Sequence, residues 1–344
     1  MKKHVNIPVF IPHLGCPNQC VFCNQRAISG VKDFIPGSVR DIIDNALSTV
    51  RDGQTAEIAF FGGSFTGIER SLMIELLKIA NEYIASKRVK SIRCSTRPDY
   101  IDEEILSILK EYNVSTIELG LQSSNDSVLR LAKRGHDFSC EEKACKMIKE
   151  QGFSLVGQMM IGLPGSTFEK ELETAEFIIN SGAESARIYP TVVFKDTELY
   201  QMSKDGLYTP ISLEDAVRRS AAVMERFLLS GVEVIRIGLC SSENLVSDNT
   251  YYAGPNHSAL GELVIGEVYY NLIKTEINSK CSNEHKRINI YVPKNSISKA
   301  KGQHRYNETR LANDFPNVEL NFCEDEKLKE YQILVESKEE IKCI

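Results

Sequence analysis

Residues 12–25 read PHLGCPNQCVFCNQ and hold three cysteines, Cys16, Cys20 and Cys23. The glycine, prolines and asparagines around them indicate a compact loop, and the apolar run at 7–11 before it predicts a strand. Thiolates held this closely on one loop can converge on one metal centre. A structural zinc site needs four ligands, and a ferredoxin-type four-iron cluster usually takes four cysteines. Three cysteines therefore leave one iron open to a substrate or cofactor.

Two other interpretations of these thiols stay open. A zinc site completed by His13, His257 or Cys240 would use the same loop, and the three cysteines could also be unrelated. Ligand count favours the cluster over zinc. The chain has ten cysteines in all and no secretory signal, which indicates reduced thiols rather than a disulfide framework.

Length and charge limit the classes of function. A chain of 344 residues predicts one large domain with a small one, although a large α/β barrel can remain single. The net charge of −6 gives no general attraction to nucleic acid, so any such contact needs a local basic patch, and DNA is not an expected partner. The apolar run after Met1 is too short for a signal peptide, and no segment is long enough to span a bilayer. We therefore expect a cytoplasmic protein without membrane contact.

Short apolar segments alternate with longer amphipathic ones from residue 7 to residue 237. The expected strands lie at 7–11, 57–61, 91–95, 116–119, 154–161 and 185–189. The expected helices lie at 39–51, 71–86, 103–111, 126–132, 141–151 and 168–181. Such alternation implies parallel strands joined by right-handed crossovers, in a doubly wound sheet or in a partial barrel.

The unusual residues decide between these two folds, because nearly all of them follow the end of a strand. They are the cysteine loop, Gly62-Gly63-Ser64, Ser95-Thr96-Arg97, Gln122 and the turn at 162–165. In a barrel these strand ends converge on one face, where active sites are built. We therefore predict an α/β fold consisting of a partial (β/α)6 TIM-like barrel over residues 1–240 with a small α+β extension.

Each of these motifs also has a purely structural interpretation. Gly62 and Gly63 would admit a ligand to the backbone or make an ordinary strand-to-helix turn, and they lack the GxGxxG spacing. The hydroxyl of Ser95 and the cation of Arg97 suit a sugar or a carboxylate, or belong to a cap for the next helix. Arg134 would hold a carboxylate bidentately or make a surface ion pair.

Two further strand ends carry candidate contacts. The turn at 162–165, Gly162-Leu163-Pro164-Gly165, offers backbone groups that can read an adenine edge. Arg187 and Tyr189 end the sixth expected strand with a cation and a phenol, and we take both as catalytic candidates facing the substrate.

The pattern Cys-x3-Cys-x-aromatic-Cys resembles the mark of the radical S-adenosylmethionine (SAM) superfamily. The resemblance extends over residues 5–240 to the radical SAM half of the catalytic subunit of Elongator, which modifies wobble uridine in transfer RNA. It is carried, in order, by FFGGSFTG, STRPDYI, ELGLQSSNDSVLRLAKRGH, MIGLPG and ARIYPTVVFKDTELY. The Elongator subunit continues into an acetyltransferase domain that this chain is expected to lack, so the acetyl-CoA-dependent reaction is not expected here.

The resemblance implies a role for each matching residue. Cys16, Cys20 and Cys23 would ligate three irons of a [4Fe–4S] cluster, and SAM would chelate the fourth. The implied SAM contacts are Gly62, Gly63 and Ser64 for the amine, Ser95 and Gln158 for the ribose, Gln122 and Arg134 for the carboxylate region, and Gly162 and Leu163 for the adenine. Ser64 stands where the superfamily usually has an acidic residue.

The implied reaction requires an electron donor, which would be a reductase, a flavodoxin or a ferredoxin. Reductive cleavage of SAM would give a 5′-deoxyadenosyl radical that abstracts hydrogen from the substrate, while the protein orients the reactants and excludes competing hydrogen donors.

The C-terminal part is expected to comprise a connecting or capping segment at 241–283 and a small domain at 284–344. A strand, a helix, a turn at 302–305, a second helix and a second strand are expected between 288 and 322, an order that resembles the core of a KH domain. The GxxG loop of that domain clamps a nucleic-acid backbone, but Arg305 replaces the second glycine here. Residues 286–310 contain seven Lys or Arg and one acid, so Lys299, Lys301 and Arg305 are candidate phosphate contacts. The alternative is a capping domain with a solvated basic face.

Three functions remain at this point. The first is a radical SAM enzyme acting on RNA, with transfer RNA favoured. The second is a radical SAM enzyme acting on a small molecule with the C-terminal segment as a lid, because porphyrinogen-oxidising relatives share the GLQS…RGH pattern. The third is a non-catalytic RNA-binding or metal-storing protein with a degenerate barrel, which the intact cysteine triad and the ordered motifs disfavour.

Overall fold

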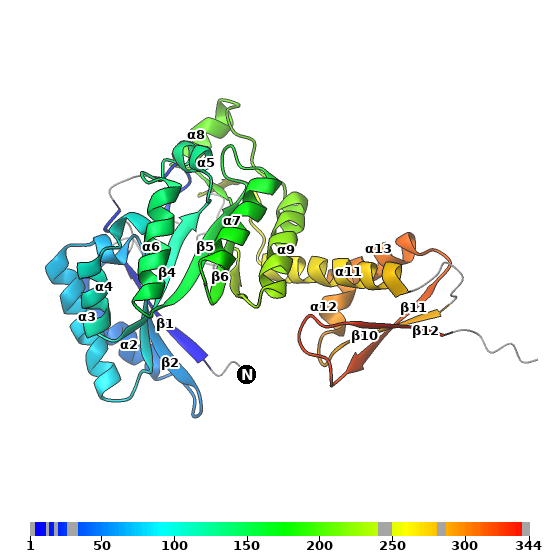
Figure 1. Ribbon diagram of the computed structural model, residues 1–344, viewed down its shortest axis with the longest axis horizontal. Helices are drawn as coiled ribbons and strands as arrows, with labels where there is room; N and C mark the ends of the chain where they lie inside the picture. The colour runs from blue at the N-terminus through cyan, green and yellow to red at the C-terminus, as the bar shows by residue number, and fades with distance from the viewer. Residues whose placement is uncertain are drawn as a thin grey trace, which may run out of the picture. The chain divides into compact units, whose positions relative to one another are not determined.

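The computed structural model describes residues 4–11, 14–16, 20–25, 34–239, 250–280 and 287–338 (Figure 1). The chain divides into two compact units. The first comprises Met1–Ala216 and Arg226–Asn256, and the second comprises Val217–Glu225 and His257–Ile344. The second unit therefore includes residues that the sequence analysis placed in a connecting segment.

A seven-stranded parallel sheet forms the centre of the first unit. Its strands are β1 (His4–Ile11), β2 (Thr55–Gly62), β3 (Ser91–Thr96), β4 (Val114–Gln122), β5 (Ser154–Ile161), β6 (Ser185–Pro190) and β8 (Glu233–Ile237). They lie side by side in chain order, without the reversal of strand order that marks a doubly wound sheet. The predicted partial barrel is confirmed, but the predicted number of six strands was one short, because β8 adds to β6 at the edge.

Helices connect successive strands and cover one face of the sheet; α4, α6 and α7 lie over that face in Figure 1. The connecting helices are α2 (Val39–Leu47), α3 (Arg70–Ala85), α4 (Glu103–Glu111), α5 (Asp126–Leu131), α6 (Phe138–Glu150), α7 (Phe168–Asn180), α8 (Glu198–Lys204) and α9 (Leu213–Leu229). Short 3₁₀ turns occupy η1 (Pro36–Ser38), η2 (Phe65–Gly67) and η3 (Pro98–Tyr100). A small antiparallel pair joins β7 (Val193–Phe194) to β9 (Tyr251–Ala253).

Local sequence sets where these helices begin. Asp102, Asn125, Asp137 and Thr167 each accept a hydrogen bond from a backbone N–H in the first turn of the helix that follows. Each cap satisfies N–H groups that have no partner within the helix. The helices therefore start just beyond the ends of the strands, and the loops between leave those ends open for functional side chains.

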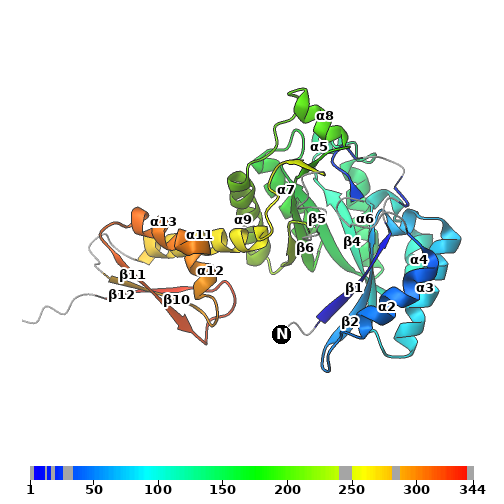
Figure 2. The same ribbon diagram turned by 180° about the vertical axis from the view of Figure 1, so that it is seen from behind.

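The second unit packs helices on a three-stranded sheet, which Figure 2 shows from behind. Its elements are α11 (Leu260–Lys280), β10 (Arg287–Pro293), α12 (Ile297–Lys301), η4 (Gln303–Arg305), α13 (Tyr306–Asp314), β11 (Glu319–Asp325) and β12 (Leu334–Lys338). The strand order is β11-β10-β12, with β10 parallel to β11 and antiparallel to β12. The series from β10 to β11 follows the expected order of strand, helix, turn, helix and strand, and β12 is an addition.

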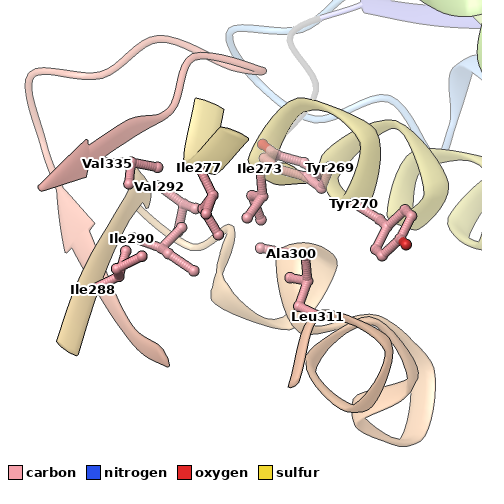
Figure 3. Close-up of a cluster of buried hydrophobic side chains, with 10 residues drawn as sticks. All are labelled: Tyr269, Tyr270, Ile273, Ile277, Ile288, Ile290, Val292, Ala300, Leu311 and Val335. Atoms are coloured by element: carbon pink, nitrogen blue, oxygen red, sulfur yellow. The ribbon is translucent and has the colours of Figure 1, made fainter. Parts of the chain in front are cut away.

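One hydrophobic cluster holds this unit together (Figure 3). Ile273 and Ile277 of α11 point toward Ile288 and Ile290 of β10, and all four side chains are buried. Burying such aliphatic side chains contributes about 1.5–3 kcal/mol each. This packing explains why α11 belongs to the C-terminal unit rather than to a linker.

Among the residues that the structure describes, no helix combines the length and the apolar character that crossing a bilayer requires.

Candidate active site at the strand ends

The cysteine loop is tied to two other segments through Val21, which is buried. Its N–H donates to the carbonyl of Ala132 at 3.2 Å, and its own carbonyl accepts from the N–H of Leu199 at 2.8 Å. Within the loop, the N–H of Cys23 donates to the carbonyl of Cys20 at 3.0 Å. The end of α5 and the beginning of α8 therefore fix where the second and third cysteines lie.

The same loop also packs backbone to backbone on the turn after β2. The N–H of Ser64 donates to the carbonyl of Leu14 at 3.1 Å. A Cβ on Gly63 would overlap that carbonyl oxygen, and a Cβ on Gly15 would overlap the carbonyl oxygen of Ser64. Gly62 has a φ of 123°, which side chains rarely adopt. These glycines let the cysteine loop approach closely; the predicted contact of Gly62 and Gly63 with a methionine amine stays a prediction.

Ser64 is fully buried, and its hydroxyl bonds within the protein. Its Oγ lies 2.7 Å from Oγ1 of Thr96, which in turn lies 2.6 Å from Oγ1 of Thr66. This hydroxyl chain joins the turn after β2 to the end of β3. Serine in place of the usual acidic residue thus has a structural partner, and its predicted role toward SAM stays a prediction.

Two arginines lie against the cysteine thiols. Nη1 of Arg134 is 3.2 Å from Sγ of Cys20, and Nη1 of Arg97 is 3.8 Å from the same sulfur. Burial raises the pKa of the Cys23 thiol to about 12, and the neighbouring Cys20 and Cys16 contribute to that rise. Burial also raises the pKa of Cys16, against the opposing effect of Arg97. The three thiols are therefore close enough to influence one another.

This donor set fits a cluster of the iron–sulfur class. Thiolates are its ligands, and guanidinium groups beside them would balance the negative charge of an iron–sulfur core. Within the described residues no group of three or more His, Cys, Asp or Glu is arranged to hold a single metal ion. In a four-iron cluster each thiolate would bind a different iron, so the three thiols need not meet at one point. His13 and Cys240, which would complete a zinc site instead, fall outside the described residues.

Arg134 and Gln122, both predicted to face the carboxylate region of SAM, meet around Gly120. Nη2 of Arg134 donates to the Gly120 carbonyl at 2.5 Å, and a Cβ on Gly120 would lie 2.9 Å from Nε2 of Gln122. Gln122 follows a β-bulge and has a positive φ of 75°, which turns its side chain toward this point. Nε of Arg134 is buried and has no hydrogen-bond partner among the described residues. A buried free donor beside the thiols fits a bound anionic group.

Ser95 and Gln158, predicted to face the ribose, also come together. Nε2 of Gln158 donates to Oγ of Ser95 at 3.3 Å and to Oε2 of Glu118 at 3.0 Å. The two side chains project from β3 and β5 on either side of β4, where Glu118 lies. The structure thus joins segments that are far apart in the sequence.

The predicted adenine-reading pair, Gly162 and Leu163, is held by the protein itself. The N–H of Gly162 donates to Oε1 of Glu171 at 2.7 Å, and its carbonyl accepts from the hydroxyl of Tyr208 at 2.7 Å. Leu163 is buried in a cluster to which Phe22, the aromatic residue of the cysteine motif, adds its ring. This cluster positions the third cysteine relative to the end of β5.

On the uncovered face of the sheet, sequence reasoning identified Arg187 but missed the charged side chains Glu57, Arg93 and Glu118. Nη1 of Arg93 bonds Glu118 at 2.9 Å, and Nε of Arg93 bonds Glu57 at 2.5 Å. Arg187 contacts Glu118 from the other side, at 2.8 Å from Nη2 and 2.7 Å from Nε. Glu118 is fully buried. These charged residues alternate with buried apolar residues along each strand, and that alternation is the sequence signal that could have identified them.

The two catalytic candidates on β6 lie within this charged network. Nη1 of Arg187 donates to the hydroxyl of Tyr189 at 3.4 Å, and the guanidinium of Arg187 stacks 5.2 Å above the Phe61 ring. Burial raises the pKa of Tyr189, so its phenol stays protonated at neutral pH. Tyr189 can therefore donate or accept a hydrogen bond at a substrate.

A second chain of polar contacts runs from Cys20 into the core. Arg97 bonds Asp99 at 2.8 Å, Asp99 lies 3.5 Å from Nδ1 of His136, and Nε2 of His136 is 3.1 Å from Glu141. Burial opposes ionisation of Asp99, but hydrogen bonds from His136 and Arg97 outweigh it and lower the pKa of this carboxyl. Burial raises the pKa of Glu141 to about 7, against the opposing effect of His136.

Replacing Glu141 by glutamine is expected to change how stability depends on pH. The folded pKa near 7 lies above the ordinary value of 4.5, so the contribution of this carboxyl is fully present below pH 4.5 and is lost as pH rises through 7. From pH 5 to pH 8 the variant should gain about 2 kcal/mol of stability relative to the wild type. Unfolding of the apoprotein at four pH values measures this difference. Glu142→Gln, at an exposed neighbour, should run parallel to the wild type, and a parallel profile for Glu141→Gln contradicts the prediction.

The basic residues proposed to contact phosphate each have an acidic neighbour in the second unit. Lys299 lies 3.2 Å from Glu330, Lys301 lies 3.3 Å from Glu308, and Arg305 also pairs with Glu308. Gly302 and Arg305 both have a positive φ, so the turn between α12 and α13 is tight. The face is less basic than the sequence indicated, because Glu330 lies beyond the stretch in which the charges were counted.

Comparison with known proteins places the chain in a family. The sequence profile of the Radical SAM superfamily matches residues 10–178, and that of the Radical_SAM C-terminal domain matches residues 183–270. An uncharacterized protein of Methanocaldococcus jannaschii is 32% identical over 60% of this chain and 67% of its own length. The tRNA uridine(34) acetyltransferase of the same organism is 30% identical over 63% of this chain, which spans only 39% of that relative.

A solved structure agrees with the fold. Elp3 of Methanocaldococcus infernus, with its N-terminus deleted, superposes with a TM-score of 0.60 at 23% identity, over 79% of this chain and 68% of that one. Two adjoining family profiles, the ordered strands and the cysteine loop at the end of β1 therefore agree: the chain belongs to the radical SAM superfamily, and its relatives include Elongator-like members.

Proposed function

We propose that this protein is an enzyme that cleaves SAM reductively and abstracts hydrogen from RNA, with transfer RNA as its substrate. The observation that carries this proposal is the convergence of Cys20, Arg134 and Gln122 at the strand ends, with Ser95 and Gln158 on neighbouring strands. Thiols, a carboxylate-binding cation and polar groups suited to a ribose lie on one edge of the sheet. The reaction needs reduced thiols, so we place it in the cytoplasm.

Each group has a distinct task. Cys16, Cys20 and Cys23 would hold a [4Fe–4S] cluster, which when bound and reduced by a flavodoxin, ferredoxin or reductase supplies the electron that cleaves SAM. Arg134 would hold the carboxylate region through the donor that is unpartnered among the described residues. Arg187 and Tyr189 would hold the substrate against the site of hydrogen abstraction.

Support for an RNA substrate comes from two sources. The relatives that match include enzymes named for tRNA uridine at position 34, and the second unit presents Lys299, Lys301 and Arg305 around a tight turn. A small-molecule substrate is the second candidate. It is favoured by the acidic partners Glu308 and Glu330, which offset those cations.

Anaerobic reconstitution followed by reduction with dithionite in the presence of SAM tests the chemistry. We expect 5′-deoxyadenosine from the wild type and none from Cys20→Ala, whose cluster would lose a ligand. Cys94→Ala is the matched control, because this thiol is buried in β3 and carries no proposed role. Zinc in place of iron after reconstitution would contradict the proposal.

Charge reversal tests the RNA substrate. The triple variant Lys299→Glu, Lys301→Glu and Arg305→Glu is expected to bind bulk transfer RNA more weakly, and the slope of log affinity against log salt should fall by about 0.7–0.9 for each phosphate that the variant no longer neutralises. Exposed ion pairs contribute little, so a phosphate can displace Glu308 or Glu330. The control reverses Lys110, an exposed residue on α4 of the first unit. RNA affinity that is unchanged in the triple variant, together with retained SAM cleavage, would leave the small-molecule candidate.

A further inference from the structure

Among the residues that the structure describes, the buried and half-buried charges on the uncovered face of the first sheet do not balance. Arg93, Arg187 and Arg236 give three positive charges, and Glu57 and Glu118 give two negative ones. The two acids are shared between Arg93 and Arg187. One positive charge is therefore left over, and it belongs to Arg236 on β8.

Arg236 lies directly beside Arg187. The two residues are register partners in the β6–β8 ladder, after an irregularity that brings Arg236 opposite Arg187. Like charges directly opposite each other on neighbouring strands repel. Glu118 neutralises Arg187 through two contacts, at 2.7 and 2.8 Å, but within the described residues no carboxylate pairs with Arg236.

The donors of Arg236 are only partly used. Its Nε donates to the carbonyl of Gly238 at 3.1 Å, which holds the side chain in place and leaves the two terminal nitrogens of the guanidinium without a described partner. Nη1 of Arg187 donates to the Tyr189 hydroxyl at 3.4 Å, and the charges of Arg187 and Arg236 both oppose the rise that burial causes in the pKa of this phenol. Arg236 is half-buried rather than sealed in, and it lies near the carboxyl end of β8. A ligand entering from the strand ends can reach it.

The carboxylate of SAM is a poor match for this position. The residues predicted to hold it, Gln122 and Arg134, meet around Gly120 at the end of β4. Strands β5 and β6 separate β4 from β8 in the sheet, so Arg236 lies three strands away. An anion bound at Arg236 would therefore be a second one, distinct from the SAM carboxylate.

We propose that Arg236, with Arg187 and the Tyr189 hydroxyl, binds an anionic group of the substrate, a phosphate or a carboxylate. A guanidinium presents paired N–H donors that match either group bidentately. This inference rests on the proposed function, and it fixes the substrate class as one that carries an anion close to the position where hydrogen is abstracted. On RNA the group is a backbone phosphate.

Thermal unfolding of the apoprotein tests the site without any cluster. Inorganic phosphate, titrated against chloride at constant ionic strength, is expected to raise the unfolding midpoint of the wild type. Arg236→Gln should need about tenfold more phosphate for the same rise, because the variant cannot form the charge-assisted pair of hydrogen bonds. Arg236→Lys, which keeps the charge but not the paired donors, should fall between the two. The matched control is Arg88→Gln, which removes the same charge from an exposed pair with Asp44.

The outcomes are decisive in both directions. A phosphate response in Arg236→Gln equal to that of the wild type, or no response in the wild type, overturns the proposal. Folding is not expected to confound the result, since removing a cation without a described acidic partner relieves repulsion with Arg187.

Equilibrium dialysis of SAM against the reconstituted protein distinguishes the two sources of the anion. Arg236→Gln should bind SAM within about twofold of the wild type, because Arg236 serves the substrate and not SAM. A tenfold loss of SAM affinity would assign Arg236 to the SAM carboxylate and overturn the proposal. Failure of the proposed function has a separate sign: the wild type then makes no 5′-deoxyadenosine, while the phosphate titration still reports on Arg236.

Discussion

Replacing Glu118 by glutamine is expected to destabilise the first unit by about 3–5 kcal/mol. Glu118 is fully buried and accepts hydrogen bonds from Arg93, Arg187 and Gln158 on three other strands. Glutamine keeps the shape but removes the negative charge, so Arg93 and Arg187 lose their shared partner and only Glu57 remains to offset the three arginines of this face. The cost of breaking a buried pair is large because the remaining charge is only slightly exposed to water, about an eighth of each arginine side chain here. Chemical denaturation of the apoprotein measures the loss.

Two further variants identify the cause. Glu82→Gln removes the same charge from an exposed pair with Arg40, and no measurable change is expected there. The double variant Glu118→Gln with Arg187→Met also removes one of the two cations that lost their partner. It should recover part of the lost stability, because the free-energy effects of substitutions at contacting residues are not additive. A single variant as stable as the wild type, or a double variant less stable than the single, contradicts this account.

The order of strands and helices was predictable because each crossover repeats one pattern. Apolar runs of four to eight residues separated by amphipathic stretches identified six of the seven strands of the first sheet, and the position of the motifs at strand ends favoured a barrel. Strand β8 was missed because no unusual motif marks the end of Glu233–Ile237. The pairing of β8 with β6 is a long-range contact, and the local pattern of apolar residues does not predict it.

The site was predictable where function requires several residue types together. Ser95 with Gln158, and Gln122 with Arg134, were assigned as pairs to parts of SAM and do meet in space. Their contact with SAM stays a prediction. The other internal charges of the sheet, Glu57, Arg93 and Glu118, were not identified, because an acid or arginine alternating with apolar residues also describes a strand with one face in water. In this fold the sheet is curved, and that curvature buries the face that carries these charges.

Long-range pairing also explains why the basic cluster in the second unit looked stronger in the sequence than it is in space. Counting charges between residues 286 and 310 found one acid, Glu308. The fold adds Glu330 beside Lys299, Glu326 at 2.5 Å from Lys294, and Glu267 beside Arg310. Strand pairing and helix packing bring these acids from outside the counted window, so a local count overestimates the surface charge.

Replacing Gly63 by alanine is expected to prevent cluster assembly while leaving the rest of the barrel folded. A Cβ at this position would overlap the Leu14 carbonyl, whose oxygen already accepts from the N–H of Ser64. Backbone cannot give way as the end of a long side chain can, so the segment that carries Cys16 must move. A cluster requires its three thiolates to converge within ångströms, so a shift of this loop removes at least one ligand. The variant should fall from about four irons per chain after reconstitution to well below one.

The expected result for Gly63→Ala separates loop placement from general instability. Gly37→Ala is the matched control, because a Cβ there meets nothing within 4 Å and the backbone does not require glycine. That variant should load iron as the wild type does. Unfolding midpoints of the two apoproteins should differ little from that of the wild type, since the clash lies at the rim of the barrel and not in its core. Full iron loading in Gly63→Ala would mean that the contact between Leu14 and Gly63 does not set the position of the thiols. The anchors at Val21 would then be sufficient to hold the loop, because they join it to Ala132 and Leu199 independently of the β2 turn.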